Sequence, residues 1–388
     1  MEFVQFHPTH MVWPLSVRGL LVTESVRGDG GVLRNSEGKR YMFGYVPDVF
    51  RAQYAETEEE ADRWYTDPDN NRRPPELLPR DEVARANNAE VKAGRGSPHG
   101  GVFLDIASRL PADQILRKLP SMYHQFKELA DVDITKEPME VGPAQHYVMG
   151  GVEVDPDTAE SLVPGLFAAG EVSGGMHGSN RLGGNSLSDL VVFGRRAGMG
   201  AAQYLDKLGE KRPVISDAEV EAAQAEALAP LGRPGGENPY TVHGEVQGTM
   251  SNLVGIIRRE GEIKQALAEL EKLRERAANV SAQGGTAYNP GWHLALDLRN
   301  IMLISECVAR AALERQESRG GHTRDDFPVM SAEWRKVNLI CSLDGEGVAL
   351  RRQEMVPMRD DLIALFDRDE LKKYMTEEEL PAETQETK

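Results

Sequence analysis

Residues 177–198, HGSNRLGGNSLSDLVVFGRRAG, hold the feature that most constrains the fold: a helix start that follows an arginine and two glycines. Ser186 and Asp189 have the spacing of a capping box, so we predict that Ser186 caps this helix. The two glycines remove side chains, and the unpaired N–H groups of a helix start attract negative charge. Because Arg181 adds a two-pronged donor, the sequence predicts an anion-binding site here.

Several other segments have recognisable local patterns. Residues 1–9 predict a strand, and residues 146–171 predict a strand, a turn, a second strand and a glycine turn that lead into the helix above. Residues 20–45 predict a β-hairpin element. The polar, Pro-rich residues 51–79 predict a long surface excursion with one short helix at 56–64.

The second half of the chain is dominated by helical periodicity. Apolar residues recur at helix spacing over residues 246–273 and 294–311, which predicts an antiparallel helical bundle. Residues 210–240 read as a linker around a short helix at 217–229, and residues 375–388 as a disordered acidic tail. The fold class is therefore predicted to be α+β and multidomain.

Composition excludes several classes of function. The chain has 45 basic and 62 acidic residues, a net charge of -17, which disfavours binding to nucleic acid or to an anionic membrane surface. Cys307 and Cys341 are the only cysteines, so neither a disulfide framework nor a Cys-rich metal site is expected. No apolar run is long enough to span a bilayer and no signal peptide is recognisable, which predicts a cytoplasmic location without direct membrane insertion.

Six stretches in a fixed order resemble one family, the flavoprotein subunit of succinate dehydrogenase and fumarate reductase. The resemblance runs from residue 1 to about residue 345. The six stretches are MEFVQFHPTH, LVTESVRGDGGVLRNSEGKRYM, PRDEVARA, HYVMGGVEVD, LFAAGEVSGGMHGSNRLGGNSLSDLVVFGRRAG and ESRGGHTRDDFP.

This resemblance implies a capping domain, a partial FAD-binding α/β domain and a C-terminal helical bundle domain. No G-x-G-x-x-G fingerprint for the FAD pyrophosphate is found, so we expect that the N-terminal FAD-binding half is absent and that the chain is a fragment starting at an internal methionine. The expected domains are a capping domain at 1–140, the returning part of the FAD-binding domain at 141–205, a linker at 206–234, a helical domain at 235–345 and a C-terminal extension at 346–388.

The resemblance also assigns residues to the interconversion of succinate and fumarate with FAD as cofactor. Two anionic ends of the dicarboxylate must be held while a hydride and a proton move. The residues implied for substrate binding are His7, Thr23, His146 and Arg181. The residues implied for proton transfer are Arg80, with Glu24 and Arg27 as its relay. The residues implied for contact with the flavin are Glu171, Ser186 and Leu187.

By the same resemblance, the electrons pass first to an iron-sulfur subunit, then to quinone. A membrane anchor subunit would hold the complex on the inner face of the cell membrane, where this chain is peripheral. The substrate partner is a dicarboxylate.

Alternatives remain open at this point. L-aspartate oxidase shares part of the pattern, although LGGNSL and Met149 disfavour it. A chain without the nucleotide-binding half is alternatively a catalytically inert fragment. His7 and His10 form an H-x-x-H pair, but no further ligands stand at matching spacing, so no metal is predicted; His10 also replaces the glycine that the family pattern has after FHPT. Arg319 and His322 are as compatible with a structural as with a functional role.

Overall fold

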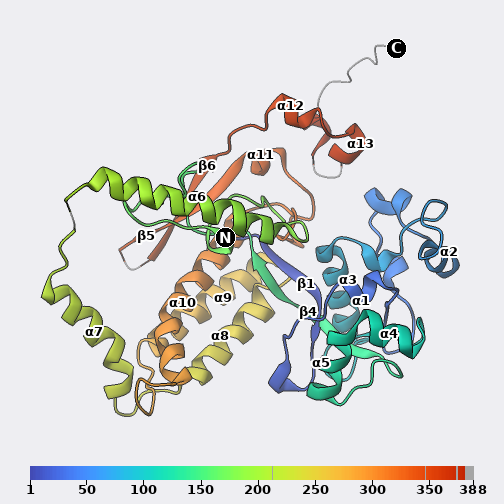
Figure 1. The fold of residues 1–388 in the computed structure, drawn as a ribbon, viewed down its shortest axis with the longest axis horizontal. Coiled ribbons are helices and arrows are strands. Elements are labelled where there is room, and N and C mark those ends of the chain that lie inside the picture. Colours follow the sequence, from blue (N-terminus) through green and yellow to red (C-terminus); the bar gives the residue numbers. More distant parts are fainter. Residues whose placement is uncertain (212, 346, 373–374, 381–388) are drawn as a thin grey trace. The chain divides into compact units, whose positions relative to one another are not determined.

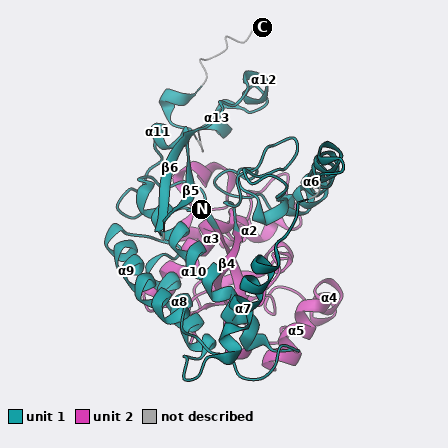
Figure 2. Ribbon diagram, turned by 90° about the vertical axis from the view of Figure 1, so that its left-hand side faces the viewer, with its two compact units in different colours: residues 1–4, 148–388 teal, residues 5–147 magenta. Residues whose placement is uncertain are grey.

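The computed structural model describes residues 1–211, 213–345, 347–372 and 375–380. The chain divides into two compact units (Figure 2). Unit 1 consists of Met1–Val4 and Val148–Lys388, and unit 2 of Gln5–Tyr147. Both helices and sheets are present, in agreement with the predicted α+β multidomain class. Each unit is described separately below.

Unit 2 is built on a four-stranded sheet with the strand order β1-β4-β3-β2 (Figure 1). Its antiparallel register pairs Leu104 of β3 with Met139 of β4, and Leu33 of β2 with Leu104. The strands are β1 (Val4–Met11), β2 (Val32–Arg34), β3 (Val102–Asp105) and β4 (Met139–Val148). Since β1 and β4 are neighbours, residues from the two ends of this unit come together in the sheet.

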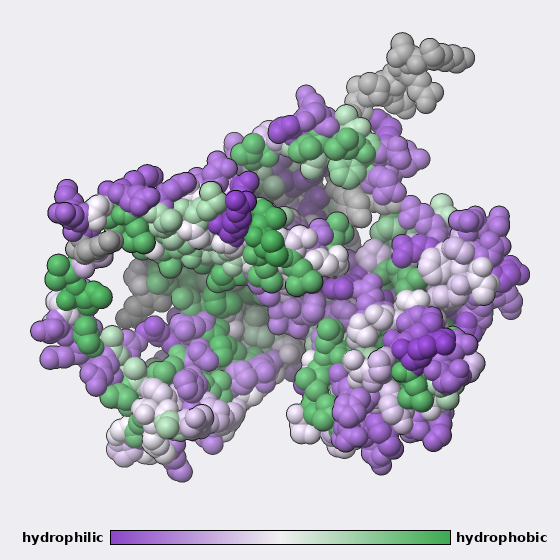
Figure 3. Space-filling view, in the orientation of Figure 1, coloured by the Kyte–Doolittle hydropathy of each residue, from purple (hydrophilic) through white to green (hydrophobic). Residues whose placement is uncertain are grey.

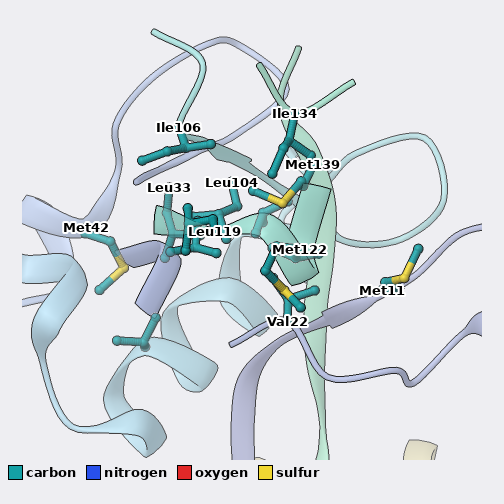
Figure 4. Close-up of a cluster of buried hydrophobic side chains, with 14 of the residues drawn as sticks. Met11, Val22, Leu33, Met42, Leu104, Ile106, Leu119, Met122, Ile134 and Met139 are labelled. Atoms are coloured by element: carbon teal, nitrogen blue, oxygen red, sulfur yellow. The ribbon is translucent and has the colours of Figure 1, made fainter. Parts of the chain in front are cut away.

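Helices cover this sheet and close a hydrophobic core. Figure 4 shows Leu33 and Leu104 from the sheet packed with Leu119 and Met122, which flank or lie in α5. The α-helices of unit 2 are α1 (Ser25–Gly28), α2 (Glu58–Trp64), α3 (Arg80–Lys92), α4 (Ala112–Lys118) and α5 (Pro120–Ala130). Its 3₁₀ helices are η1 (Leu15–Val17), η2 (Met42–Tyr45), η3 (Asp48–Gln53) and η4 (Pro75–Leu77). The strand predicted near the start and the short helix predicted in the surface excursion are confirmed.

Unit 1 contains the helical bundle predicted from periodicity. The helices α8 (Pro239–Leu253), α9 (Glu260–Ala277) and α10 (Pro290–Glu314) pack against one another. Their apolar faces are buried through residues that include Val246, Leu270 and Leu298. Each of these positions belongs to the predicted periodic series, so the bundle forms because one face of each helix is apolar.

The remaining elements of unit 1 lie on either side of this bundle in the sequence. An antiparallel hairpin pairs β5 with β6 from Val337↔Glu354 to Asp344↔Gly347. The elements are η5 (Gly170–Val172), α6 (Asn185–Leu208), α7 (Asp217–Gly232), α11 (Ala332–Arg335), β5 (Val337–Asp344), β6 (Gly347–Glu354), α12 (Asp360–Ile363), α13 (Arg368–Leu371) and η6 (Glu377–Glu379). The helix predicted at 217–229 corresponds to α7. Most of the predicted acidic tail, residues 381–388, lies outside the described residues.

Two strand predictions are wrong. Over residues 20–45, helix α1 replaces part of the expected hairpin, β2 pairs with β3, and a single bridge joins Arg34 to Arg40. Over residues 149–171, isolated bridges such as Val152↔Ser173 stand in place of a second continuous strand. In both segments frequent glycines favour turns, so the extended runs are too short to form ladders.

Helix α6 exposes an apolar face. Leu187 and Val191 are 69% and 73% exposed, and hydrophobic side chains reach the surface along this helix (Figure 3). Leu190, Val192, Met199 and Leu205 are also exposed. Contiguous exposed apolar surface generally marks a contact site, so we infer that this face of α6 is a contact surface.

Candidate functional site

Six of the ten candidate residues lie in unit 2, and its sheet brings two of them together. His7 on β1 and His146 on the neighbouring strand β4 have ring centroids 5.3 Å apart. His7 is 1% exposed, and its Nδ1 lies 3.1 Å from the carbonyl oxygen of Thr9 and accepts from the N–H of Thr9 at 3.3 Å. The local chain therefore fixes the orientation of this imidazole.

Arg27 is the most unusual residue of this region. It ends the first turn of α1, is fully buried, and donates from Nη1 to the carbonyl oxygen of Glu76 at 2.5 Å. Its Nε and Nη2 are buried and have no hydrogen-bond partner among the described residues. A buried guanidinium with unmet donors is costly, because its desolvation is not offset by partners.

An ion pair with Arg40 holds the side chain of Glu76 in place. The guanidinium of Arg40 donates from Nε and Nη2 to both carboxylate oxygens of Glu76, at 2.7 and 2.9 Å. Arg40 also bonds Asp62 at 3.0 Å. The bidentate pair with Arg40 fixes Glu76, and the carbonyl oxygen of Glu76 in turn anchors Nη1 of Arg27. The other two nitrogens of Arg27 have no partner among the described residues.

Glu24 and Arg80 form the ion pair expected for the proton-transfer residues. Arg80, the first residue of α3, donates from Nε and Nη2 to Glu24 Oε2 at 2.8 and 2.7 Å. Burial opposes the shift, but the charges of Arg27 and Arg80 lower the pKa of Glu24, so this carboxylate is ionised at neutral pH. Thr23 precedes it and accepts from the N–H of Ser25 at 3.4 Å.

Electrostatics keep the imidazole of His7 uncharged. Burial, followed by the charges of Arg27 and Arg80, lowers the pKa of His7 to about 2. Burial also lowers the pKa of Arg27, Glu24 raises it, and Arg80 lowers it. Two cations near neutral imidazoles make a region that favours an anion, because a carboxylate would supply the acceptor that Arg27 lacks.

His10 is the residue that sequence reasoning missed in unit 2. Its ring centroid lies 5.2 Å from that of His7 and 6.1 Å from that of His146. Residues three apart on a regular strand point to opposite faces, so the H-x-x-H spacing alone does not predict this contact. We call His7, His10, Arg27 and His146 the Arg27 cluster. Among the described residues, no group of three metal-ligating side chains could hold a metal ion.

The other four candidate residues lie in unit 1, at the start of α6 and before it. Arg181 is 5% exposed and donates from Nη1 to Ser186 Oγ and to the carbonyl oxygen of Leu182, both at 3.4 Å. Leu187 is exposed. Glu171, in η5, is also exposed and accepts from the N–H of Val148 at 3.0 Å.

The predicted capping box at this helix is wrong. Helix α6 begins at Asn185, and its N-cap is Gly184, whose φ of 84° lies in the left-handed region and which offers no side-chain cap. Ser186 therefore lies inside the first turn, and the buried Asp189 contacts Nε2 of His177 at 3.3 Å. Gly184 offers no side chain to cap the N–H groups of the first turn, so this helix start suits an electron-rich group.

Unit 1 has its own set of buried charged residues, which includes part of the ESRGGHTR segment. We call Glu2, Arg258, Arg315, Glu317 and His322 the Arg315 cluster. Arg315 donates from Nε to Glu2 at 2.5 Å and from Nη1 to Glu317 at 2.9 Å. Arg258 donates to Nδ1 of His322 at 2.7 Å, while Nε2 of His322 lies 3.3 Å from the carbonyl oxygen of Arg315.

These contacts favour a structural over a functional role for Arg319 and His322. Burial lowers the pKa of His322 well below its usual value, so the neutral ring accepts from Arg258. Arg319 donates from Nε to both carboxylate oxygens of Glu317 at 3.1 Å. Because these charges are paired within the unit, the segment braces the fold.

Comparison with known proteins gives two matches along the chain. Residues 1–187 match the family model described as FAD binding domain, and residues 243–362 match the model described as fumarate reductase flavoprotein C-term. The first match does not support the expectation that the FAD-binding half is absent. It includes all ten candidate residues, although the sequence has no G-x-G-x-x-G turn.

Three relatives illustrate the similarity. The solved structure of Sdh1 from Mycobacterium smegmatis in complex with UQ1 is 61% identical with a TM-score of 0.78, and the match covers 97% of this chain and 59% of that one. A component of the fumarate reductase (CoM/CoB) of Methanothermobacter marburgensis is 41% identical over 340 residues, 88% of this chain and 56% of the relative. The succinate dehydrogenase flavoprotein subunit of Coxiella burnetii is 35% identical over 383 residues, 95% of this chain and 60% of the relative.

The chain thus spans somewhat more than half the length of these relatives. Among the described residues, no helix combines the length and the apolar character needed to cross a membrane.

Proposed function

We propose that this chain, which is similar to succinate dehydrogenase and fumarate reductase flavoproteins, takes part in the FAD-dependent interconversion of succinate and fumarate. The observation that carries this proposal is the buried guanidinium of Arg27, which has two nitrogens without a partner among the described residues and whose charge acts on the neutral imidazole of His7. A dicarboxylate is the kind of ligand that supplies the missing acceptors.

Unit 2 contributes the groups for one end of the substrate and for the proton. His7 and Thr23 are proposed to hold a carboxylate, with His146 as a further substrate-binding residue. Arg80 is proposed to move the proton, with Glu24, whose Oε2 lies 2.7 Å from Nη2 of Arg80, and Arg27 as its proposed relay.

Unit 1 contributes residues that fit a flavin. The N-cap of α6 is Gly184, which has no side chain to cap the helix, Leu187 presents an exposed apolar surface, and Glu171 presents an exposed carboxylate. We propose that Ser186, Leu187 and Glu171 contact FAD and that Arg181 binds a substrate carboxylate. When bound, FAD supplies the acceptor for the hydride that leaves succinate.

The proposed electron path continues into other proteins. An iron-sulfur subunit would receive the electrons, and a membrane anchor subunit with its quinone would follow it. The solved structure of the 61% identical relative is a complex with UQ1, which supports a quinone as the final acceptor. We propose that this chain is peripheral to the inner face of the cell membrane through those subunits.

The test is anaerobic reduction of the visible flavin absorbance after the chain is mixed with FAD. Succinate should bleach the flavin, and fumarate should restore it, while malonate should compete with succinate. L-aspartate is the control substrate, because bleaching by L-aspartate alone would identify an L-aspartate oxidase instead. A chain that binds FAD and malonate but is bleached by neither substrate would refute the redox proposal.

A further inference from the structure

His10 has a fixed position beside the proposed substrate-binding residues. Its backbone forms an antiparallel bridge with Leu21, and the flanking bonds run from Met11 N to Leu20 O at 2.8 Å and from Val22 N to Thr9 O at 3.1 Å. Thr9 Oγ1 adds a bond to the carbonyl oxygen of Val22 at 2.9 Å. This pairing ties His10 to the segment that leads directly into Thr23, Glu24 and Arg27.

The imidazole of His10 is buried and one of its nitrogens is unsatisfied. The residue is 4% exposed, and its Nδ1 has no hydrogen-bond partner among the described residues. A buried polar nitrogen without a partner costs free energy that a purely structural side chain would avoid. His10 contacts the rings of His7 and His146, so this nitrogen lies in the Arg27 cluster, where Arg27 has unmet donors as well.

The ring can act as a donor without carrying charge. Burial, followed by the charge of His146, lowers the pKa of His10 to about 4, although a hydrogen bond from the ring to the backbone of His7 raises it. A neutral imidazole carries its proton on one nitrogen only. An ionised carboxylate accepts hydrogen bonds and cannot donate them, so a carboxylate ligand selects the form of His10 with the proton on Nδ1.

We propose that His10 is a further substrate-binding residue, whose Nδ1–H donates to the same carboxylate of the dicarboxylate that His7 holds. The inference rests on the proposed function, because it takes the ligand to be a dicarboxylate. It adds a third imidazole to the set of groups around that carboxylate, and it assigns the contact to one nitrogen of the ring. Only the Nδ1 position of His10 makes this bond.

Two isosteric variants test the nitrogen assignment. The amide nitrogen of asparagine replaces Nδ1, and that of glutamine replaces Nε2, so His10→Asn keeps the proposed donor and His10→Gln does not. Malonate binding is measured by titration calorimetry on the flavin-loaded chain, and KM and kcat for succinate are measured alongside. His124→Ala is the matched control, because this histidine of the same unit is exposed.

We expect His10→Ala and His10→Gln to raise the Kd of malonate and the KM of succinate by about 10- to 100-fold, the range for a lost bond to a charged group. His10→Asn should stay within about threefold of the parent, as should His124→Ala, and kcat should change little in any variant. The contrast between the Asn and Gln variants separates binding from folding, because both amides replace the ring with a smaller polar group.

Three results overturn the inference in different ways. Equal malonate affinity in the parent and all His10 variants would remove His10 from the site and leave the proposed function standing. Rescue by glutamine but not by asparagine would likewise refute the Nδ1 contact. A parent protein that binds neither malonate nor succinate would overturn the proposed function itself, and the role of His10 with it.

Discussion

The Arg315 cluster and the Arg27 cluster differ in how far the hydrogen-bond donors of a buried arginine are satisfied. In the Arg315 cluster of unit 1, Arg315 meets Glu2 and Glu317, and its remaining donor reaches the carbonyl oxygen of Val337 at 2.8 Å. In the Arg27 cluster of unit 2, Arg27 has one bond to a carbonyl oxygen and two nitrogens without a partner among the described residues. Among the described residues, the donors of Arg315 are satisfied and two of those of Arg27 are not.

This difference gives a way to separate structural from functional arginines. Both side chains are buried, and both lie close to a buried histidine whose pKa is lowered. Burial and perturbed pKa values therefore do not distinguish the clusters, whereas hydrogen-bond satisfaction does. Four measurements follow from the contrast.

The largest effect is expected for Arg80→Gln. Loss of the proposed proton carrier should lower succinate-dependent reduction of the flavin by about 10²- to 10⁴-fold, because general acid–base groups contribute on that scale. Stability should change by no more than about 1 kcal/mol, since the Glu24–Arg80 pair is partly exposed.

Arg85→Gln on the same helix is the matched control. Arg85 pairs with Asp81 and Glu82 on α3, and no catalytic role is proposed for it. Stopped-flow reduction of the flavin in both variants would decide the matter. Comparable losses of rate in the two would show that α3 needs its arginines for folding alone.

Arg315→Met should have the largest effect on stability. It leaves the carboxylates of Glu2 and Glu317 buried without their main cation, and breaking such a pair costs about 3–5 kcal/mol. Urea unfolding followed by circular dichroism measures this loss. An unchanged unfolding midpoint would mean that the bonds of this cluster do not brace unit 1.

Arg27→Met should have the opposite effect to Arg315→Met: it should weaken ligand binding and change stability little. Removal of an incompletely paired cation should change stability by no more than about 1 kcal/mol, because the lost bond to Glu76 is offset by the lost cost of burying the charge. Malonate binding should weaken by about 10- to 100-fold. If instead the variant loses several kcal/mol of stability and keeps its affinity for malonate, Arg27 stabilises the fold as Arg315 does and does not bind the ligand.

The smallest effect is a dependence on pH. His10 has a pKa lowered from 6.5 to about 4, so in acid the unfolded chain binds a proton that the folded chain does not. Stability is then fully present above pH 6.5 and is lost as the pH falls toward 4, by up to about 1.4 kcal/mol per pH unit. The groups that face this ring are His7 and His146, with the charge of Arg27 nearby.

His10→Asn removes this proton binding, so its stability should fall less between pH 6.5 and 5 than that of the parent. Urea unfolding at several pH values gives the two slopes, and His124→Asn serves as the control because this side chain is exposed. Parallel slopes in the parent and His10→Asn would show that His10 titrates normally in the folded chain.

Sequence alone was sufficient where a local pattern decides the structure. The three bundle helices follow from apolar residues at helix spacing. Helix α2 forms within the range predicted for a short helix, and Thr57 caps it by accepting from the N–H of Glu60 at 3.2 Å. Helix α6 was misjudged at its first turn. Its start depends on the left-handed backbone of Gly184, which replaces a side-chain cap and leaves no signal beyond the glycine itself.

The candidate site was only partly open to prediction, for a related reason. Motifs of the family indicated Arg27, Glu24 and Arg80, but the unmet donors of Arg27 depend on where Glu76 lies, and Arg40 fixes that residue from another part of the chain. The sequence marked His10 only as half of an H-x-x-H pair and as a departure from the family pattern after FHPT. Its closeness to His146 comes from the pairing of β1 with β4, which sequence spacing does not encode.

Binding of the proposed dicarboxylate at Arg27 would also link the lifetime of the protein to the supply of that ligand. A ligand that completes this guanidinium binds the folded chain and not the unfolded one, so at a concentration 100 times its Kd it would add about 2.7 kcal/mol to the free energy of unfolding. A change of that size lowers the unfolded population by about 100-fold and slows proteolysis that depends on unfolding. The abundance of the protein would then follow the supply of its dicarboxylate.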